Sequence, residues 1–253
     1  MVANLTGTAW LRQLRPDAEA TTVLVCFPPG GGAATAYRAL AQEFGTGTAV
    51  YAVQYPGRQD RVSDPLVTSL TALAQQSAAD LLRWPATARL ALFGHSMGAT
   101  VAYETARALE AAGRDLAHLF VSGRPAPAHE ESARLHLAPD SALIADLERL
   151  ANDPTSVAIL RTEPSLADLV LPAVRADYQA VETYRHQPTT PLRTPISALV
   201  STDDPTTTVT QAQQWATYTT ADFAAATFPG RHFYLDLPEN LRPLAEFVTS
   251  RLR

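Results

Sequence analysis

Ser96 lies in the pentapeptide Gly94-His95-Ser96-Met97-Gly98, a pattern that can carry a nucleophilic serine. The apolar segment 89–93 precedes it, and an alanine-rich segment without proline follows it, which is the strand-turn-helix setting of a nucleophile elbow. Backbone segments approach closely in such a turn, so glycine is needed at positions 94 and 98 while the serine hydroxyl stays exposed. The pentapeptide therefore predicts Ser96 as the nucleophile of covalent catalysis.

A serine hydroxyl needs a general base to remove its proton, and His232 is the best placed of the six histidines. It follows the apolar segment 223–228 and the turn residues Pro229 and Gly230, close to the carboxyl terminus. This position fits the chain order serine, acid, histidine that the elbow requires. The other histidines lack that order, and we expect structural or surface roles for His95, His118, His129, His136 and His186.

The imidazole in turn needs a carboxylate, and Asp203-Asp204-Pro205 directly follows the apolar segment 196–200. We choose Asp204 as the acid. Aspartate before proline is also a common turn starter, so we expect one of the two aspartates to have only that role. Residues 122–125, after the preceding apolar segment, contain no carboxylate and offer no alternative acid.

Two backbone amides are needed to stabilise an oxyanion, and one should be the N–H of Met97 at the start of the predicted helix. The other should come from the loop Phe27-Pro28-Pro29-Gly30-Gly31-Gly32. Pro29 has no N–H, so Gly30 or Gly31 must donate. Phosphate binding by this loop is disfavoured because the sequence has neither GxGxxG nor a GK[ST] ending there.

Short apolar segments alternate with longer helix-like segments along the chain, which predicts an α/β protein with the α/β-hydrolase fold: a mostly parallel central sheet flanked by helices. The predicted strands cover residues 21–27, 48–53, 88–93, 117–122, 195–200 and 223–228, with a further edge strand around 10–14. The predicted helices that flank them cover residues 68–83, 97–112 and 239–252, and Gly113 is placed as a helix C-cap.

The connection between the strands ending at 122 and starting at 195 is far longer than a simple crossover needs. We predict a helical lid, approximately residues 128–190, inserted in a single domain that covers residues 1–253. A helix is expected after the capping-type residues Asp140 and Ser141, and another over 165–184 with a kink at Pro172. The apolar positions of the first helix are Leu143, Ile144, Leu147 and Leu150.

Composition narrows the class of protein further. With 253 residues and 46% hydrophobic content, the chain can bury one continuous core. A net charge of −5 argues against binding to nucleic acid or to an anionic membrane. No long apolar run or secretory signal pattern is found, so we expect a soluble cytoplasmic protein. The single cysteine, Cys26, is expected in the core, and no metal-ligand spacing or cofactor motif is present.

These motifs together resemble one known family, the type II thioesterases that accompany polyketide and nonribosomal peptide synthetases. The resemblance covers nearly the whole chain and rests on CFPPGGG (26–32), YPGRQDR (55–61), GHSMG (94–98), SGRPAP (122–127), LPAVRADY (171–178), DDP (203–205) and GRHFYL (230–235). It implies a hydrolase of acyl thioesters held on the phosphopantetheine arm of an acyl or peptidyl carrier protein, with Ser96, Asp204 and His232 as the triad. The resemblance also implies a stand-alone enzyme because the acid follows the later strand, and we expect a monomer.

Some positions depart from the family pattern. Pro29-Gly30 stands where the family often has His-Ala or Tyr-Ala, and residues 150–154 replace a glycine pair that many members carry in the lid. For Arg58 and Arg61, which match the family motif, we favour a buried structural ion pair. Two other functions compete with the thioesterase: an esterase or acyltransferase acting on free small molecules, and a non-catalytic carrier-binding protein. The second is disfavoured because binding does not need three triad residues in order.

Overall fold

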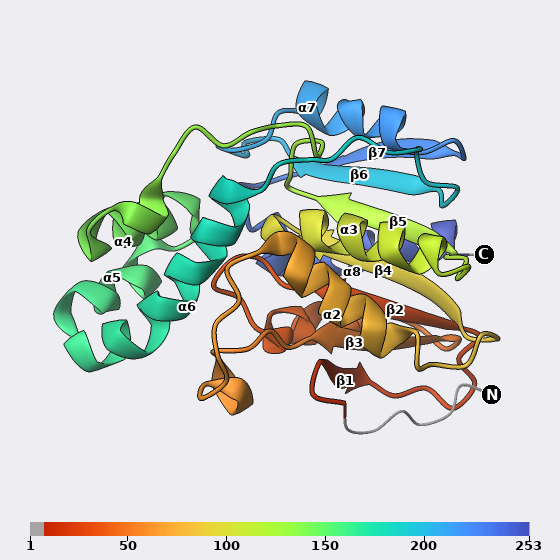
Figure 1. Ribbon diagram of the computed structural model, residues 1–253, viewed down its shortest axis with the longest axis horizontal. Coiled ribbons are helices and arrows are strands. Elements are labelled where there is room, and N and C mark those ends of the chain that lie inside the picture. The colour runs from red at the N-terminus through yellow and green to blue at the C-terminus, as the bar shows by residue number, and fades with distance from the viewer. Residues whose placement is uncertain (1–7, 253) are drawn as a thin grey trace.

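The computed structural model describes residues 8–252, and its centre is a seven-stranded sheet in the order β1-β3-β2-β4-β5-β6-β7 (Figure 1). The strands are β1 (Leu11–Arg15), β2 (Thr22–Phe27), β3 (Thr48–Val53), β4 (Arg89–His95), β5 (His118–Ser122), β6 (Ile196–Ser201) and β7 (Phe223–Phe228). All predicted strands are present, with ends shifted by at most two residues. Only β1 is antiparallel to its neighbour, and the remaining pairs are parallel, as the α/β-hydrolase fold requires.

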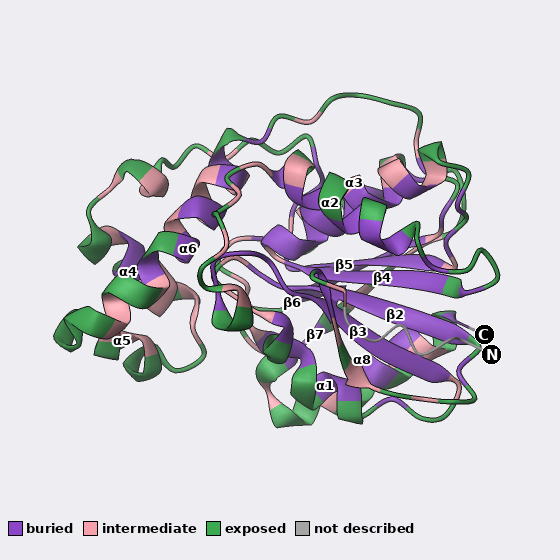
Figure 2. Ribbon diagram, turned by 60° about the horizontal axis from the view of Figure 1, so that its bottom comes forward, coloured by how far each residue is buried: buried purple, intermediate pink, exposed green. Residues whose placement is uncertain are grey.

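The strands β2, β3, β5 and β6 are buried on both faces, which explains their continuous apolar character, whereas the edge strand β7 is only partly buried (Figure 2). Alternate residues of β2 point to opposite sides: Val23 and Val25 join one core cluster, and Leu24 and Cys26 join the other. Burial raises the pKa of the Cys26 thiol above its usual range. The prediction that Cys26 packs in the core is therefore confirmed.

Helices cover both faces of the sheet. One cluster includes residues of α2 (Leu70–Leu81) and α3 (Met97–Ala111), and the other includes residues of α1 (Arg38–Gln42) and α8 (Pro238–Arg251). The C-cap of α3 is Ala112, one residue before the predicted Gly113, and Gly113 ends the helix in the left-handed conformation with φ +78° and its amide donating to the carbonyl of Glu110. A short helix, α7 (Val209–Gln213), follows β6.

The long connection between β5 and β6 contains α4 (Asp140–Leu150), α5 (Pro154–Thr162) and α6 (Pro164–Thr183). Figure 1 shows these three helices grouped beyond one end of the sheet. The two predicted helices are present, and α6 continues through Pro172. No helix within residues 8–252 is both long and apolar enough to cross a membrane.

Two details of this connection differ from the prediction. Asp140 and Ser141 do not cap α4, because the N-cap position is Pro139 and both residues lie within the first turn. The helix α5 was not predicted, although its signals are present in the sequence. Asp153 accepts a hydrogen bond from the amide of Thr155, and Pro154 occupies the first helical position, where its missing N–H costs nothing.

His118 is buried in β5, where its Nε2 lies 2.8 Å from Ser197 Oγ on β6 and its ring stacks on Phe120. Burial, aided by the positive charge of Arg251, lowers the pKa of His118 to about 4 from an ordinary value of 6.5. The unfolded chain therefore binds a proton in the window between these two values, and the folded chain does not. Stability must fall as the pH drops through this window.

We expect the free energy of unfolding to decrease between pH 7 and pH 5 by about 2 kcal/mol more in the native protein than in a His118→Gln variant. The glutamine cannot be protonated, while its amide can still reach Ser197. Urea denaturation at the two pH values measures the difference. Equal pH dependence in the two proteins would show that His118 does not carry this loss.

Candidate active site

Ser96 lies at a sharp turn between β4 and α3 with φ 54° and ψ −123°, a conformation that non-glycine residues rarely adopt. The Ser96 amide donates to the carbonyl of Ser122 at 2.8 Å. A Cβ at Gly94 would lie 2.1 Å from the carbonyl oxygen of Gly98, and one at Gly98 would lie 2.0 Å from that of Phe27. Both predicted glycine requirements of the elbow are confirmed.

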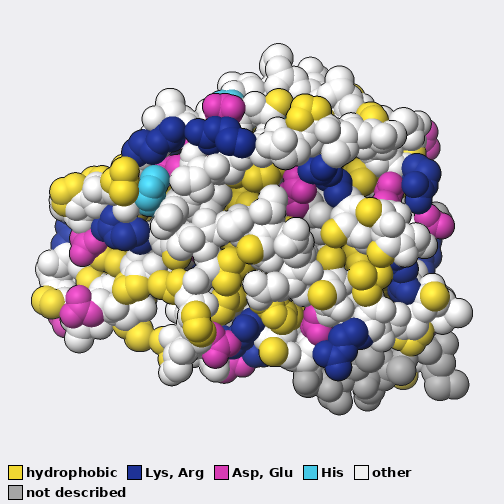
Figure 3. Space-filling model, viewed as in Figure 1, with side chains coloured by type: hydrophobic (Ala, Val, Ile, Leu, Met, Phe, Trp, Pro, Cys, Tyr) yellow, Lys and Arg dark blue, Asp and Glu magenta, His cyan; other side chains and the backbone are white. Residues whose placement is uncertain are grey.

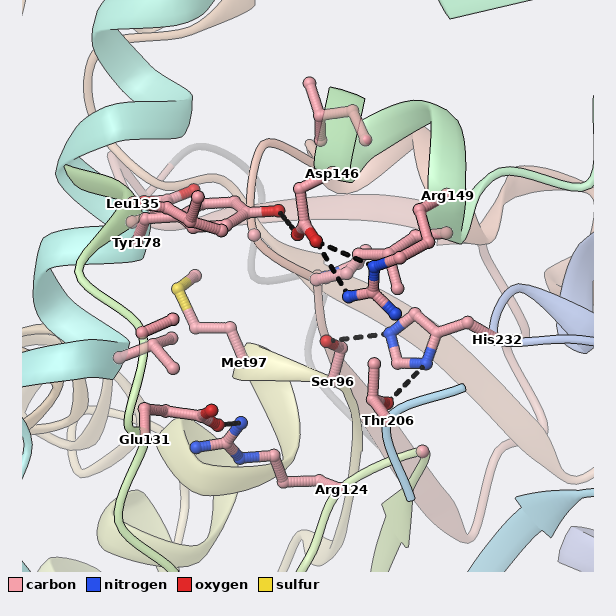
Figure 4. Close-up of a pocket in the computed structure, with 18 of the residues that line it drawn as sticks. Ser96, Met97, Arg124, Glu131, Leu135, Asp146, Arg149, Tyr178, Thr206 and His232 are labelled. Atoms are coloured by element: carbon pink, nitrogen blue, oxygen red, sulfur yellow. Dashed lines mark hydrogen bonds and ion pairs between the residues drawn. The ribbon is translucent and has the colours of Figure 1, made fainter. Parts of the chain in front are cut away.

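The structure brings together the three residues of the predicted triad. His232 Nε2 lies 3.0 Å from Ser96 Oγ, and His232 Nδ1 lies 3.0 and 3.1 Å from the two carboxylate oxygens of Asp204. Figure 4 shows the hydroxyl of Ser96 facing the imidazole from the turn before α3. The side chains of His232 and Asp204 are almost fully buried, so water competes little for these hydrogen bonds.

Asp204 and Asp203 have different surroundings. Burial disfavours the charge on Asp204, but hydrogen bonds from His232 and Thr206 outweigh it and keep the pKa of the carboxyl below its usual value. Asp203 is exposed and accepts a hydrogen bond from the hydroxyl of Thr202. The choice of Asp204 as the acid partner thus agrees with the geometry.

Thr206 was not predicted as part of the site. Its amide and hydroxyl donate to Asp204 Oδ1 at 2.8 and 2.7 Å, and its hydroxyl lies 3.1 Å from His232 Nδ1. These contacts form the turn that aspartate before proline favours, so Asp204 both starts a turn and contacts the imidazole. The sequence predicts that starting a turn and serving as the acid are separate roles of the two aspartates, whereas Asp204 has both.

Among the described residues, no histidine other than His232 forms a hydrogen bond with the Ser96 hydroxyl. His95 Nδ1 lies 2.9 Å from Ser122 Oγ, and its ring packs 4.9 Å from that of His232, measured between ring centroids. Burial and the neighbouring His232 lower the pKa of His95 well below its usual value, so it stays neutral. His136 contacts Glu182, His186 lies among tyrosines, and His129 is exposed.

A cavity of about 330 Å³ opens beside Ser96, between the carboxyl ends of the strands and the inserted helices. Its floor includes Gly30, Met97 and His232, and helices α4 and α6 line the opposite side. Charged groups in this lining are paired: Arg124 with Glu131 at 2.5 Å, and Arg149 with Asp146 at 2.7 Å (Figure 4). The Tyr178 hydroxyl also donates to Asp146 at 2.6 Å. No role in the site was predicted from the sequence for Arg124, Glu131, Asp146, Arg149 or Tyr178.

The two candidate amides of the glycine loop differ in the structure. The Gly31 amide already donates to Asp177 Oδ2 at 2.7 Å, so it is not available to a substrate, and Gly31 is withdrawn as a candidate donor. The Gly30 amide has no protein acceptor within residues 8–252, and Gly30 lines the cavity together with Met97. Met97 is the first residue of α3, where amides have no intrahelical acceptor.

This arrangement suits acyl transfer through a serine nucleophile. An imidazole within hydrogen-bond distance of the hydroxyl can take its proton, and the buried carboxylate can stabilise the imidazolium. The described residues contain no group of three or more histidine, cysteine or acidic side chains that could hold a metal ion.

Comparisons with known proteins point to one family. The family model described as "Thioesterase domain" matches residues 22–252. The chain is similar to thioesterase PikA5 of Streptomyces venezuelae, with 38% identity over 92% of this chain and 82% of the relative. It is 41% identical to a probable cadicidin biosynthesis thioesterase of Streptomyces griseus, over 92% of this chain but only 63% of that longer relative.

A solved structure shows the same likeness in three dimensions. The type II thioesterase BorB, from the borrelidin biosynthetic cluster, superimposes with a TM-score of 0.86 and 39% identity. The match covers 99% of this chain and 100% of BorB.

Proposed function

Since the chain belongs to the thioesterase family and is similar to its type II members, we propose that it hydrolyses acyl thioesters held on the phosphopantetheine arm of a carrier protein. Such a step would clear stalled or wrongly primed chains from a polyketide or nonribosomal peptide synthetase. The single observation that carries the proposal is the hydrogen-bonded series Ser96, His232 and Asp204 at the base of a cavity.

In the proposed mechanism, His232 Nε2 accepts the proton of Ser96 as Oγ attacks the thioester carbonyl carbon. The amides of Met97 and Gly30 stabilise the oxyanion of the tetrahedral intermediate. The intermediate collapses, the carbon–sulfur bond breaks, and His232 returns the proton to the leaving pantetheine thiol. Asp204 stabilises the imidazolium throughout.

The second half repeats the cycle with water. His232 deprotonates a water molecule that attacks the acyl-serine, and the proton then passes to Ser96 Oγ as the free acid departs. No metal or organic cofactor is needed for either half. The inserted helices form one side of the cavity, so we propose that residues 128–190 act as a lid over a single-domain enzyme.

The proposed partner is an acyl or peptidyl carrier protein. Leu137, Ile159 and Leu169 are exposed on the inserted segment, and Figure 3 shows hydrophobic side chains over this end of the molecule. Apolar side chains that remain exposed are candidate contacts for another protein. We propose that the enzyme itself is a monomer and acts in the cytoplasm.

The proposal is tested by comparing acyl groups on a phosphopantetheinylated carrier protein with the same groups on a simple thiol and on oxygen esters. We expect a kcat/KM that is at least about tenfold higher for the carrier-bound thioester, because the partner supplies binding energy that the small substrates lack. Equal or faster hydrolysis of the free oxygen esters would instead support an esterase of small molecules.

A further inference from the structure

Three sequence motifs that have no part in the triad meet at one buried ion pair. Arg58 belongs to the segment 55–61, and Asp177 belongs to α6 in the segment 171–178. Arg58 donates two hydrogen bonds to the Asp177 carboxylate, from Nη1 at 2.6 Å and from Nη2 at 2.9 Å. The two side chains are 9% and 1% exposed. The third motif is the glycine loop, which both residues contact.

The buried ion pair expected for Arg58 is thus confirmed, whereas Arg61 differs. Arg61 pairs with Asp64, whose side chain is 44% exposed, and its guanidinium lies over the Trp10 ring. Of these two arginines, Arg58 is the one that pairs with a residue of α6 and also donates to the glycine loop.

The pair contacts the glycine loop on two sides of the Gly31–Gly32 peptide. Asp177 Oδ2 accepts a hydrogen bond from the Gly31 amide at 2.7 Å, and Arg58 Nη1 donates to the Gly32 carbonyl at 3.0 Å. Val174, on the same helix as Asp177, packs against Gly31: a Cβ at that glycine would lie 3.0 Å from Val174 Cγ2. The loop can therefore rotate little about this peptide while the ion pair is formed.

The Gly30–Gly31 peptide, whose N–H donates to Asp177, directly follows the residue whose amide lines the cavity. Gly30 precedes Gly31, so the direction of the Gly30 N–H depends on how the next peptide is fixed. An oxyanion donor works only when its N–H already points at the developing charge. A buried charged pair is a poor source of stability by itself, because desolvation of both ions offsets their attraction.

We propose that Arg58 and Asp177 are positioning residues that orient the Gly30 amide toward the oxyanion, acting through the Gly31 amide and the Gly32 carbonyl. This inference rests on the proposed function, in which Ser96 forms the tetrahedral intermediate. Asp177 lies on α6, so its hydrogen bond with the Gly31 amide also connects the inserted segment to the glycine loop.

Two double variants separate positioning from fold stability. Arg58→Met with Asp177→Asn removes both charges but keeps a carbonyl oxygen that can accept from the Gly31 amide. Arg58→Met with Asp177→Leu removes both charges and that acceptor. Both variants replace the ion pair by neutral groups of similar size, which proteins often tolerate. As a matched control, Glu148→Gln breaks an ion pair to Arg161 that links α4 and α5 without touching the glycine loop.

We expect kcat for a carrier-bound thioester to fall about 10²-fold in the leucine double variant and at most about tenfold in the asparagine double variant, with KM changed less than about threefold in both. A displaced oxyanion donor affects the transition state more than the bound substrate. Glu148→Gln should change kcat by less than about twofold. Thermal melting establishes that the two double variants are equally folded.

Equal kcat values in the two double variants at equal melting temperatures would overturn the positioning role. Arg58→Lys keeps the charge but loses the bidentate contact with Asp177. It is the variant to use if the leucine double variant does not fold. Its kcat should fall about tenfold at unchanged KM, and an unchanged kcat would overturn the role. If the native enzyme shows no Ser96-dependent hydrolysis, the proposed function itself fails, which is a different result from an active enzyme with unaffected variants.

Discussion

Replacing Ser96 by alanine is expected to lower the turnover of an acyl thioester by about 10⁴- to 10⁶-fold. The substitution removes the hydroxyl oxygen that His232 contacts and that forms the acyl-enzyme in the proposed mechanism, while His232 and the oxyanion amides remain in place. The remaining rate is then that of water attacking a bound substrate. Release of free thiol from an acylated carrier protein measures the loss.

The same variant should fold normally. Ser96 occupies a strained backbone position, and removing its hydroxyl leaves the packing of the elbow unchanged. An unchanged melting temperature together with loss of labelling by a fluorophosphonate probe would complete the test. If Ser96→Ala kept more than about a tenth of the native turnover, the serine mechanism would be wrong.

Asp204→Asn is expected to lower kcat by about 10⁴-fold, the size of the effect in other serine triads. The carboxylate holds the proton of His232 on Nδ1, leaving Nε2 free to accept from Ser96, and it stabilises the imidazolium that follows. An asparagine amide can donate to Nδ1 instead, which places the imidazole proton on the wrong nitrogen. Steady-state hydrolysis of the carrier-bound thioester measures kcat.

Asp203→Asn is the matched control, because it makes the same change at the adjacent residue. Asp203 is exposed and contacts Thr202 rather than His232, so kcat should change by less than about twofold. Similar losses in the two variants would contradict the assignment of Asp204 as the acid.

The sequence was informative about the triad because each of its members lies at a strand end with a recognisable turn. Gly94 and Gly98 mark the elbow of Ser96, Asp204 precedes a proline, and His232 follows Pro229 and Gly230. The carboxyl ends of parallel strands meet at one edge of a sheet, so residues at these ends come together. The period and length of the apolar segments predicted that sheet.

The contacts of the inserted helices could not be predicted in the same way. Helical periodicity indicated α4 and α6, but it does not say which side chain of α6 meets which loop. Asp177 contacts Arg58 and Gly31, which are 119 and 146 residues away in the chain. The loss of Gly31 as an oxyanion donor follows from this distant contact. The helix α5 was missed for a different reason, since its Asp153-Pro154 start was read only as a departure from the family pattern.

The central claim, that Ser96 accepts the acyl group of a carrier-bound thioester, is tested most directly by intact-protein mass spectrometry. An acylated, phosphopantetheinylated carrier protein is mixed with the enzyme and quenched in acid at short times. We expect the carrier protein to lose the mass of the acyl group, and the enzyme to gain it transiently on the peptide that contains Ser96. Loss of the acyl group from the carrier protein in the presence of Ser96→Ala at the native rate would contradict the account.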